Sequence, residues 1–326
     1  MNTTNTLDRD TSASSWNSYW QGDNESSAYS SSGVNHQGIN EYWTSLFSQL
    51  ESQNSISNFL DIASGNGALP ELAMQVFKQH NVEITATDIS AAAIANISQR
   101  FPEINCVVAD ALTLPFPLQS FDLVTSQFGI EYAGLEAIGP ALALVKPGGA
   151  LAFMLHVSGG SIDQECQSNQ NALEQLEESL FVPTARKMFD FGFKAMAGAD
   201  RRAYDDAASD LATTLPAVEA IIQGFGGEIA GGLPRNLYKD VASITGKLTN
   251  YHPDDVLPWI DSMQIEIKAY RNRMQSMLEA SLDEQQFSEI CSEITDHGFE
   301  LQDNAALLDQ QTQLPLAWVI RARKSS

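Results

Sequence analysis

Cysteine is scarce in this chain, and its three occurrences form no pattern. Cys106, Cys166 and Cys291 lie far apart in the sequence. A disulfide framework uses an even number of cysteines, and a zinc knuckle needs two that are close together. The sequence therefore indicates neither a disulfide scaffold nor a metal knuckle, and we expect a reducing, cytoplasmic location.

Long apolar runs are also absent. The longest, residues 150–157, has the length of a β-strand, whereas a membrane helix needs about 20 apolar residues. The first residues of the chain, MNTTNTLDRDTSASS, lack the apolar stretch of a signal peptide. We expect neither a membrane span nor a secretory leader.

Positive charge is in short supply, because 18 Lys and Arg stand against 41 Asp and Glu and give a net charge of -23. Proteins that bind nucleic acids or anionic membranes present basic patches, so both are poor candidates as partners. With 43% hydrophobic residues, the chain has enough apolar side chains for a sizeable core.

Residues 1–57 are predicted to form an N-terminal helical segment that is partly disordered. Its beginning is rich in Ser, Asn and Thr and includes SSAYSSSG at 26–33. Trp16, Tyr19 and Trp20 are spaced by three and four residues and therefore share one face of a helix. That face either packs permanently against the body of the protein or closes over a binding crevice as a lid.

Residues 58–157 alternate short apolar strands with helical stretches. Strands separated by helices indicate parallel βαβ units with right-handed crossovers. Continuous apolar runs indicate a sheet that helices cover on both faces. We predict an α/β fold with a Rossmann-like, doubly wound, mostly parallel sheet. Its strands are expected at 59–63, 82–87, 104–109, 121–128 and 150–157.

Residues 158–282 contain no predicted strand and are interpreted as an inserted helical cap or substrate subdomain. The clearest helix in it, 255–278, repeats apolar residues at alternating steps of four and three. This seam is either core packing or a dimer contact, so we expect a monomer or a homodimer. The sheet resumes in residues 283–326, where a helix precedes a C-terminal antiparallel hairpin. Prolines are expected to break the cap helices at Pro183, Pro216, Pro234, Pro253 and Pro258.

The most informative stretch is LDIASGNGALPELA at 60–73, where a predicted strand runs through Gly65 and Gly67 into a helix. Glycines there let the backbone approach a ligand, and a helix N-terminus offers free N–H groups. A strand–turn–helix connection also needs glycine for purely structural reasons. A dinucleotide site has a third glycine where this chain has Pro70. A nicotinamide-dependent oxidoreductase is therefore a less favoured interpretation.

Two acidic residues end neighbouring predicted strands. Asp88 ends the second strand, where a doubly wound nucleotide site places a carboxylate against ribose hydroxyls. The alternative for Asp88 is to cap the following helix, although Ser90 is the better cap. Asp110 ends the third strand and can accept a hydrogen bond from an adenine amine, or it is an ordinary turn residue.

Five stretches, in this order along the chain, resemble the motifs of the class I S-adenosylmethionine-dependent methyltransferases: LDIASGNG, ATDIS, VVADALTLPF, FDLVTSQFGIEYA and LVKPGGALAF. The resemblance covers about residues 58–157 and 283–326 and implies a domain that binds S-adenosylmethionine. The chain departs from the family pattern at Ala63, where the family often has its first glycine.

The resemblance also implies roles for single residues. Asp61 would order the loop, Gly65 and Gly67 would flank the methionine portion, and Asp88 would hold the ribose. Asp110 and Ala111 would meet the adenine, and Gln127 would border the methionine portion. The full set of cofactor-binding residues expected from it is Asp61, Ala63, Gly65, Gly67, Asp88, Ile89, Asp110, Ala111 and Gln127, with Trp16 and Trp20 from the N-terminal segment.

Methyl transfer from a sulfonium needs in-line placement of a nucleophile and, where that nucleophile carries a proton, a base. Ligands of open α/β sheets lie beyond the carboxyl ends of the strands, where Tyr132 and His156 are expected. His156 has an unperturbed pKa suited to a base near neutral pH, and the alternative is a structural role. Tyr132 is a second catalytic candidate or a wall residue. The cluster of Cys166, His156, Asp163 and Glu165 matches no zinc spacing, so no metal site is expected.

We therefore expect an S-adenosylmethionine-dependent methyltransferase that acts on a small organic acceptor by in-line transfer. The cap leaves from a strand end that borders the crevice, so it is expected to cover the acceptor pocket; a protein acceptor stays open. The alternative from another class is a non-catalytic S-adenosylmethionine-binding protein with a regulatory or assembly role.

Overall fold

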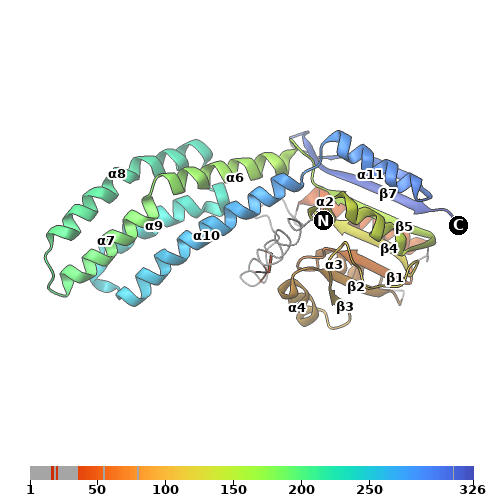
Figure 1. The fold of residues 1–326 in the computed structure, drawn as a ribbon, viewed down its shortest axis with the longest axis horizontal. Helices are drawn as coiled ribbons and strands as arrows, with labels where there is room; N and C mark the ends of the chain where they lie inside the picture. Colours follow the sequence, from red (N-terminus) through yellow and green to blue (C-terminus); the bar gives the residue numbers. More distant parts are fainter. Residues whose placement is uncertain (1–15, 18–19, 21–35, 54–55, 79–80, 311) are drawn as a thin grey trace, which may run out of the picture. The chain divides into compact units, whose positions relative to one another are not determined.

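The computed structural model describes residues 16–17, 20, 36–53, 56–78, 81–310 and 312–326 (Figure 1). The disorder expected near the N-terminus, Tyr19 and the SSAYSSSG stretch lie outside these residues. The chain divides into two compact units, one made of residues 1–164 with 277–326 and the other of residues 165–276. Within the part of the chain that the structure describes, no helix has the length and apolar character needed to cross a membrane.

The first unit is built on a seven-stranded sheet with the strand order β3-β2-β1-β4-β5-β7-β6. Strands β1 to β5 pair in parallel, and β7 runs antiparallel to both β5 and β6. Because the order reverses between β1 and β4, the sheet is doubly wound, and the predicted fold class is confirmed. The strands are β1 Asn58–Ile62, β2 Glu83–Asp88, β3 Asn105–Val108, β4 Phe121–Gln127, β5 Val145–Leu155, β6 Phe299–Leu308 and β7 Pro315–Lys324.

Helices cover both faces of this sheet. They are α2 Gln37–Ser52, α3 Ala68–Val76, α4 Ala91–Arg100, α5 Ile138–Leu144 and α11 Glu284–Asp296. Leu60 and Ile62 of β1 belong to a buried cluster that includes side chains of α5 and α11. Successive residues of a strand point to opposite faces. Phe59 accordingly packs on Phe47 of α2, with ring centroids 5.7 Å apart.

The second unit is helical and has a buried apolar core of its own. Its helices are α6 Ser161–Glu178, α7 Phe181–Met196, α8 Arg202–Phe225, α9 Leu233–Gly246 and α10 Pro253–Ala280. Helix α10 covers the predicted helix at 255–278 and extends it at both ends. Helices α6 and α10 also carry the chain between the two units, since each crosses a boundary between them.

The prediction that every proline breaks a cap helix is wrong at two positions. Pro216 lies inside α8 and Pro258 lies inside α10. A proline inside a helix costs about 3 kcal/mol because it lacks an N–H and crowds the preceding turn. In α8 the buried side chains of Leu211, Val218 and Ile221 flank Pro216 and offset that cost by tertiary packing.

Candidate active site

The loop between β1 and α3 presents bare backbone at the carboxyl end of the sheet. Ala63, Gly65 and Gly67 all have positive φ, of 55°, 51° and 83°. A side chain at Gly67 has no room, because a Cβ there would lie 2.9 Å from Cγ1 of Ile97. The glycines thus allow both the left-handed conformation and the close packing of the loop.

Asp88 connects this loop to the end of β2. Its Oδ2 accepts the N–H of Gly65 at 2.9 Å, and its Oδ1 accepts the N–H of Ser90 at 2.8 Å. The side chain is only 7% exposed, and burial raises its pKa although both hydrogen bonds act in the opposite direction. The N-cap of α4 is Ser90, whose Oγ accepts the N–H of Ala93 at 3.2 Å. The Asp88 carboxylate therefore serves the glycine loop and leaves helix capping to Ser90.

Asp61 lies beneath the same loop, in β1. Its Oδ1 accepts the hydroxyl proton of Thr125 in β4 at 2.7 Å, and the Ser64 hydroxyl donates to its backbone carbonyl at 3.0 Å. Burial raises the pKa of Asp61 to about 7, against the lowering effect of hydrogen bonds from Thr125 and Ser64, and the charge of Asp88 raises it further. These contacts tie the loop to two strands, as a loop-ordering role requires.

The residues expected to meet the adenine follow neighbouring strands. Asp88 pairs with Val108 across β2 and β3, so Ile89 and Asp110 both follow this paired end of the sheet. Ile89 is a large apolar side chain that is 36% exposed. Asp110 Oδ1 accepts the N–H of Leu112 at 2.9 Å, which makes a local turn. A flat base placed here would cover Ile89 and gain apolar burial.

Gln127 ends β4 and supplies a further test of the expected cofactor. Its Oε1 is buried and has no hydrogen-bond partner among the described residues. A buried acceptor without a donor costs about 1–3 kcal/mol, which a ligand donor such as an ammonium group would remove. S-adenosylmethionine fits the bare loop, the carboxylate at the end of β2, the exposed Ile89 and the unpaired Oε1 of Gln127.

The described part of the N-terminal segment contacts the site at three places. The Trp20 side chain is 7% exposed, and a Cβ at Gly65 would lie 2.8 Å from its Cζ2, so its ring lies against the glycine loop. Asn17 Oδ1 accepts a backbone N–H in the first turn of α4 at 2.9 Å. Trp16 meets Tyr132 edge to face, with ring centroids 5.3 Å apart. The structure thus places both predicted tryptophans beside predicted site residues.

His156 follows β5 and is 3% exposed. Its Nε2 lies 3.0 Å from the hydroxyl oxygen of Tyr132, and its backbone N–H donates to Oε1 of Glu131 at 2.9 Å. The Phe128 ring stacks on the imidazole at a centroid distance of 4.5 Å. Burial lowers the pKa of His156 to about 3, so the neutral form prevails at neutral pH. A general-base role for His156 stays a prediction, and its burial opposes such a role because it disfavours the protonated product.

Two residues next to the site were not predicted from the sequence. Glu131 is 7% exposed, burial raises its pKa to about 7, and its Oε2 has no hydrogen-bond partner within the described chain. Gly129 approaches the glycine loop so closely that a Cβ would lie 2.5 Å from the Cβ of Ala63. The sequence pattern that could have indicated these two residues is the stretch FGIEYA, in which a glycine and an acidic residue closely follow a buried strand.

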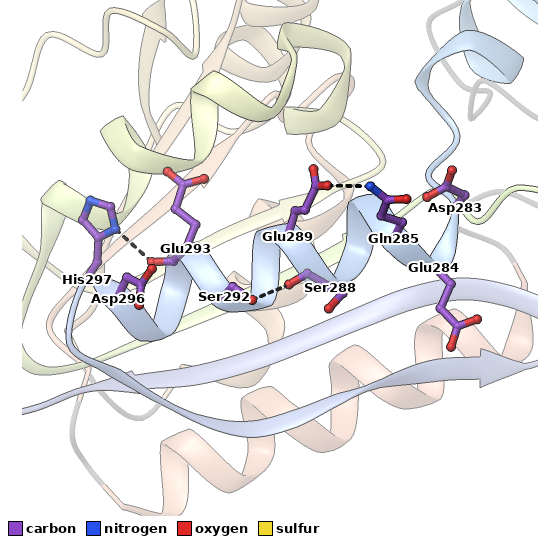
Figure 2. Close-up of a pocket in the computed structure, with 9 residues that line it drawn as sticks. All are labelled: Asp283, Glu284, Gln285, Ser288, Glu289, Ser292, Glu293, Asp296 and His297. Atoms are coloured by element: carbon purple, nitrogen blue, oxygen red, sulfur yellow. Dashed lines mark hydrogen bonds between the residues drawn. The ribbon is translucent and has the colours of Figure 1, made fainter.

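An open groove also runs along α11 (Figure 2). Its lining consists of exposed or half-exposed polar side chains of one helix and its flanks: Asp283, Glu284, Gln285, Ser288, Glu289, Ser292, Glu293, Asp296 and His297. Gln285 donates to Glu289 at 3.0 Å, and Ser292 donates to the carbonyl of Ser288 at 2.9 Å. These bonds are internal to the helix, and none of the predicted site residues lines the groove.

Comparison with known proteins places the same part of the chain in a family. Residues 59–149 match the family model described as a methyltransferase domain. A ubiquinone/menaquinone biosynthesis C-methyltransferase UbiE of Rickettsia prowazekii is 30% identical over 173 residues, which cover 44% of this chain and 68% of that protein.

A demethylmenaquinone methyltransferase of Renibacterium salmoninarum is 33% identical over 94 residues, which cover 28% of this chain and 38% of that protein. The chain thus spans well under half of the length of this relative. Among solved structures, the N-methyltransferase NodS from Bradyrhizobium japonicum in complex with S-adenosyl-l-homocysteine is 21% identical, with a TM-score of 0.35, and covers 43% of this chain and 72% of that one. From the family match and the two-thirds coverage of the Rickettsia protein, the chain belongs to the class I S-adenosylmethionine-dependent methyltransferases.

Proposed function

We propose that the protein transfers the methyl group of S-adenosylmethionine to a small organic acceptor. The observation that supports this most is the Asp88 carboxylate, which lies at the end of β2 and holds the N–H of Gly65 in the glycine loop. A carboxylate directly beside bare backbone supports the proposal, because a carboxylate can also accept hydrogen bonds from ribose hydroxyls.

In this proposal, different residues bind the ribose, the adenine and the methionine portion of the cofactor. Asp88 binds the ribose hydroxyls, while Ile89, Asp110 and Ala111 surround the adenine. Gly65, Gly67 and Gln127 adjoin the methionine portion, and Asp61 orders the loop from below. S-adenosylmethionine supplies a methyl group that its sulfonium has already activated. The protein has only to place an acceptor in line with that methyl group and to exclude water.

The acceptor side of the proposal rests on the aromatic residues beyond β4 and β5. Trp16, Phe128 and Tyr132 are all partly buried and lie around His156 or against one another. An apolar, ring-lined wall favours a small organic molecule over a nucleic acid, and the net charge of -23 agrees with this. These two relatives are named for the methylation of demethylmenaquinone and for ubiquinone/menaquinone biosynthesis, and a quinone-type ring is the acceptor we would test first. We place the reaction in the cytoplasm, where the three free cysteines stay reduced.

Calorimetry with S-adenosylhomocysteine and, separately, with NAD+ tests the cofactor assignment. We expect binding of the first and none of the second. Turnover is tested with methyl-labelled S-adenosylmethionine and a small-molecule extract, and we expect S-adenosylhomocysteine to form only when the extract is present. Cofactor binding without any turnover would favour a non-catalytic binding protein, and binding of NAD+ alone would overturn the proposal.

A further inference from the structure

The hydrogen-bond ladder along β5 continues past the point where β4 leaves it. Gln127 pairs with Met154, and the N–H of Phe128 donates to the Met154 carbonyl at 2.7 Å. In a parallel pair, every second residue directs both its N–H and its carbonyl to the same neighbouring strand. His156 comes two residues after Met154. It therefore directs both of its main-chain groups to the side on which β4 has ended.

At Phe128 the chain turns away from the sheet toward the glycine loop, and its φ there is 50°. The next residue, Gly129, approaches that loop so closely that a Cβ would lie 2.5 Å from the Cβ of Ala63. Such a turn removes the main-chain carbonyl of β4 that would otherwise accept the N–H of His156. A buried N–H without an acceptor is destabilising, so another group has to replace that carbonyl.

Glu131 supplies this acceptor from its side chain. The N–H of His156 donates to Oε1 of Glu131 at 2.9 Å. The carbonyl of His156 accepts the N–H of Leu282 at 3.0 Å, and Val157 pairs in parallel with Leu282. We call residues 281–282, which follow α10, the return segment. The ladder along β5 thus runs from the main chain of β4, through one carboxyl group, to the return segment.

The return segment is also anchored to β7 and α11, within the first unit. The carbonyl of Leu282 accepts the N–H of Ser158 at 3.0 Å and the indole N–H of Trp318 at 2.9 Å. The Trp318 ring stacks on Phe287 of α11 with centroids 4.3 Å apart. Leu282 itself is 4% exposed and belongs to the core cluster of the sheet. The carboxyl group described above connects this anchored segment, through β5, to the turn after β4.

On this basis we propose that Glu131 is a positioning residue for the methyl acceptor, which fixes the end of β5 and the return segment through the main chain of His156. Ligands of open α/β sheets lie beyond the carboxyl ends of the strands, and both fixed segments border the ends of β4 and β5. The proposal deepens the methyltransferase function proposed above and rests on it. Because Gly129 of the same turn touches the glycine loop, one turn supports both the cofactor side and the acceptor side.

This role requires an oxygen atom at Glu131 and not a negative charge. Burial raises the pKa of Glu131 to about 7, although the hydrogen bond from the backbone of His156 acts in the opposite direction. A protonated carboxyl group still has an oxygen that can accept the N–H of His156. A glutamine amide has the shape of the protonated carboxyl group and offers the same acceptor. A methionine side chain has a similar length but places a methyl group where Oε1 stood.

Hydrogen exchange in the full-length protein tests the ladder without any ligand. Mass spectrometry compares the peptides that contain His156 and Leu282 with a peptide from β1, which reports the overall stability. We expect Glu131→Met to raise the exchange of both amides relative to β1 by about tenfold or more, because the N–H of His156 loses its acceptor. Glu131→Gln should change this ratio by less than about threefold. Ser90→Ala is the control, because it removes the N-cap of α4 and should leave the ratio unchanged.

Turnover and cofactor affinity separate positioning from acid–base catalysis. Calorimetry should show that both Glu131 variants bind S-adenosylhomocysteine within about threefold of the wild type. With methyl-labelled S-adenosylmethionine and the small-molecule extract, Glu131→Met should lose turnover by about tenfold or more. Glu131→Gln should keep the turnover of the wild type and the shape of its pH profile, because a glutamine cannot act as a base.

Three results would overturn the positioning role. The first is a Glu131→Gln protein that loses turnover while its exchange stays slow, since the carboxyl group would then act by its charge or its proton. The second is a Glu131→Met protein with the exchange or the turnover of the wild type. The third is weaker cofactor binding in Glu131→Met, which would place the role on the cofactor side. A wild type that binds no S-adenosylhomocysteine would instead overturn the proposed function, and the exchange result would still show whether Glu131 holds the ladder.

Discussion

The two carboxylate oxygens of Asp88 accept different backbone N–H groups, one in the glycine loop and one before α4. We predict that Asp88→Ala weakens S-adenosylhomocysteine binding by about 1–3 kcal/mol, because it leaves both buried N–H groups and the ribose hydroxyls without an acceptor. Calorimetry measures this directly.

Ser90→Ala is the matched control for Asp88→Ala. It removes the N-cap of α4 and should lower the free energy of unfolding by about 0.5–2 kcal/mol, while the Asp88 carboxylate stays in place. Its cofactor affinity should stay near that of the wild type. Unchanged affinity in a folded Asp88→Ala protein would remove Asp88 from the site.

Burial shifts the pKa of His156 and of Asp61 in opposite directions, from 6.5 to about 3 and from 3.8 to about 7. Between pH 6.5 and about 3, the unfolded chain takes up a proton at His156 that the folded protein does not, so the free energy of unfolding falls as the pH is lowered. Between pH 3.8 and about 7, folded Asp61 keeps a proton that the unfolded chain loses, so the free energy of unfolding falls as the pH rises.

Each pH effect predicts the behaviour of a variant. His156→Gln should lose less stability than the wild type when the pH falls from 6.5 to about 4. Asp61→Asn should lose less stability than the wild type when the pH rises from about 4 to 7. For each variant, the slope of the free energy of unfolding against pH should differ from that of the wild type by at most about 1.4 kcal/mol per pH unit, the value for one proton. Urea unfolding at a series of pH values measures them, and slopes equal to that of the wild type would contradict the shifts.

The strand-end positions of the residues that we propose to bind the cofactor could be predicted from sequence because they depend on local patterns. Asp88 and Asp110 each follow an apolar strand, and parallel strands bring their carboxyl ends to one edge of a sheet. The state of His156 did not follow from its neighbours in sequence. Its burial depends on Phe128 and Tyr132, which follow β4, and on Leu282, which is distant in sequence; burial lowers its pKa to about 3, whereas a near-neutral value was expected.

At the scale of elements, the N-terminal segment is expected either to pack permanently against the first unit or to close over the cofactor as a lid. Trp20 lies on the glycine loop, and Asn17 Oδ1 accepts a backbone N–H in the first turn of α4. We predict that deleting residues 1–33 weakens S-adenosylhomocysteine binding, and that it lowers the melting temperature more with S-adenosylhomocysteine present than without it. The reason is linkage, because a segment that closes over a ligand stabilises the bound form in particular.

Fluorescence gives an independent measurement of this closure. Adding S-adenosylhomocysteine should change the tryptophan emission of the wild type and of Trp259→Phe, whose substituted ring lies in the second unit. The change should be much smaller in Trp20→Phe. If the deletion lowers the melting temperature equally with and without ligand, the segment packs permanently and is no lid.

The elements that sequence patterns predicted best are those with continuous apolar runs. Strand β4 was predicted at 121–128 and spans Phe121–Gln127. Strand β5 begins at Val145 and not at residue 150, because Val145 pairs with Phe121 before an irregularity in the register and Ala150 pairs with Leu123 after it. A bulge that contains Pro147 and two glycines is read from sequence as a turn. Local patterns thus predict strands well but do not show where pairing resumes across a bulge.

At the scale of the whole molecule, the two units have separate apolar cores. The core cluster of α6 to α10 contains only residues of the second unit. We predict that residues 165–276 expressed alone fold into a helical protein with a cooperative thermal transition, since the core that stabilises them is complete. Circular dichroism measures this. Phe189→Ala removes a fully buried ring and should cost about 3–5 kcal/mol in the fragment. A fragment that melts without cooperativity would show that the core needs the first unit.

Within the first unit, the segment before α6 and the segment after α10 meet at His156. The N–H of Ser158 donates to the carbonyl of Leu282 and the N–H of Leu282 donates to the carbonyl of His156, both at 3.0 Å. Because these bonds join the segment before α6 to the segment after α10 within the first unit, we expect that a short linker from residue 164 to residue 277 leaves the sheet unaltered. Every residue proposed to bind the cofactor lies in the first unit.

We predict that this shortened protein binds S-adenosylhomocysteine with nearly the affinity of the wild type and loses turnover of the natural acceptor by tenfold or more. The reason is that the inserted segment is expected to bind the acceptor, so its removal lowers turnover. The strand ends that bind the cofactor remain in the shortened protein. Calorimetry measures the first quantity, and formation of S-adenosylhomocysteine from an extract measures the second. A shortened protein that turns over the extract as fast as the wild type would show that the insert serves another purpose. Loss of both cofactor binding and turnover in a protein with an intact sheet would mean that the insert supports the cofactor site as well. The hydrogen bonds at His156 and Leu282 would then be the contacts to alter next.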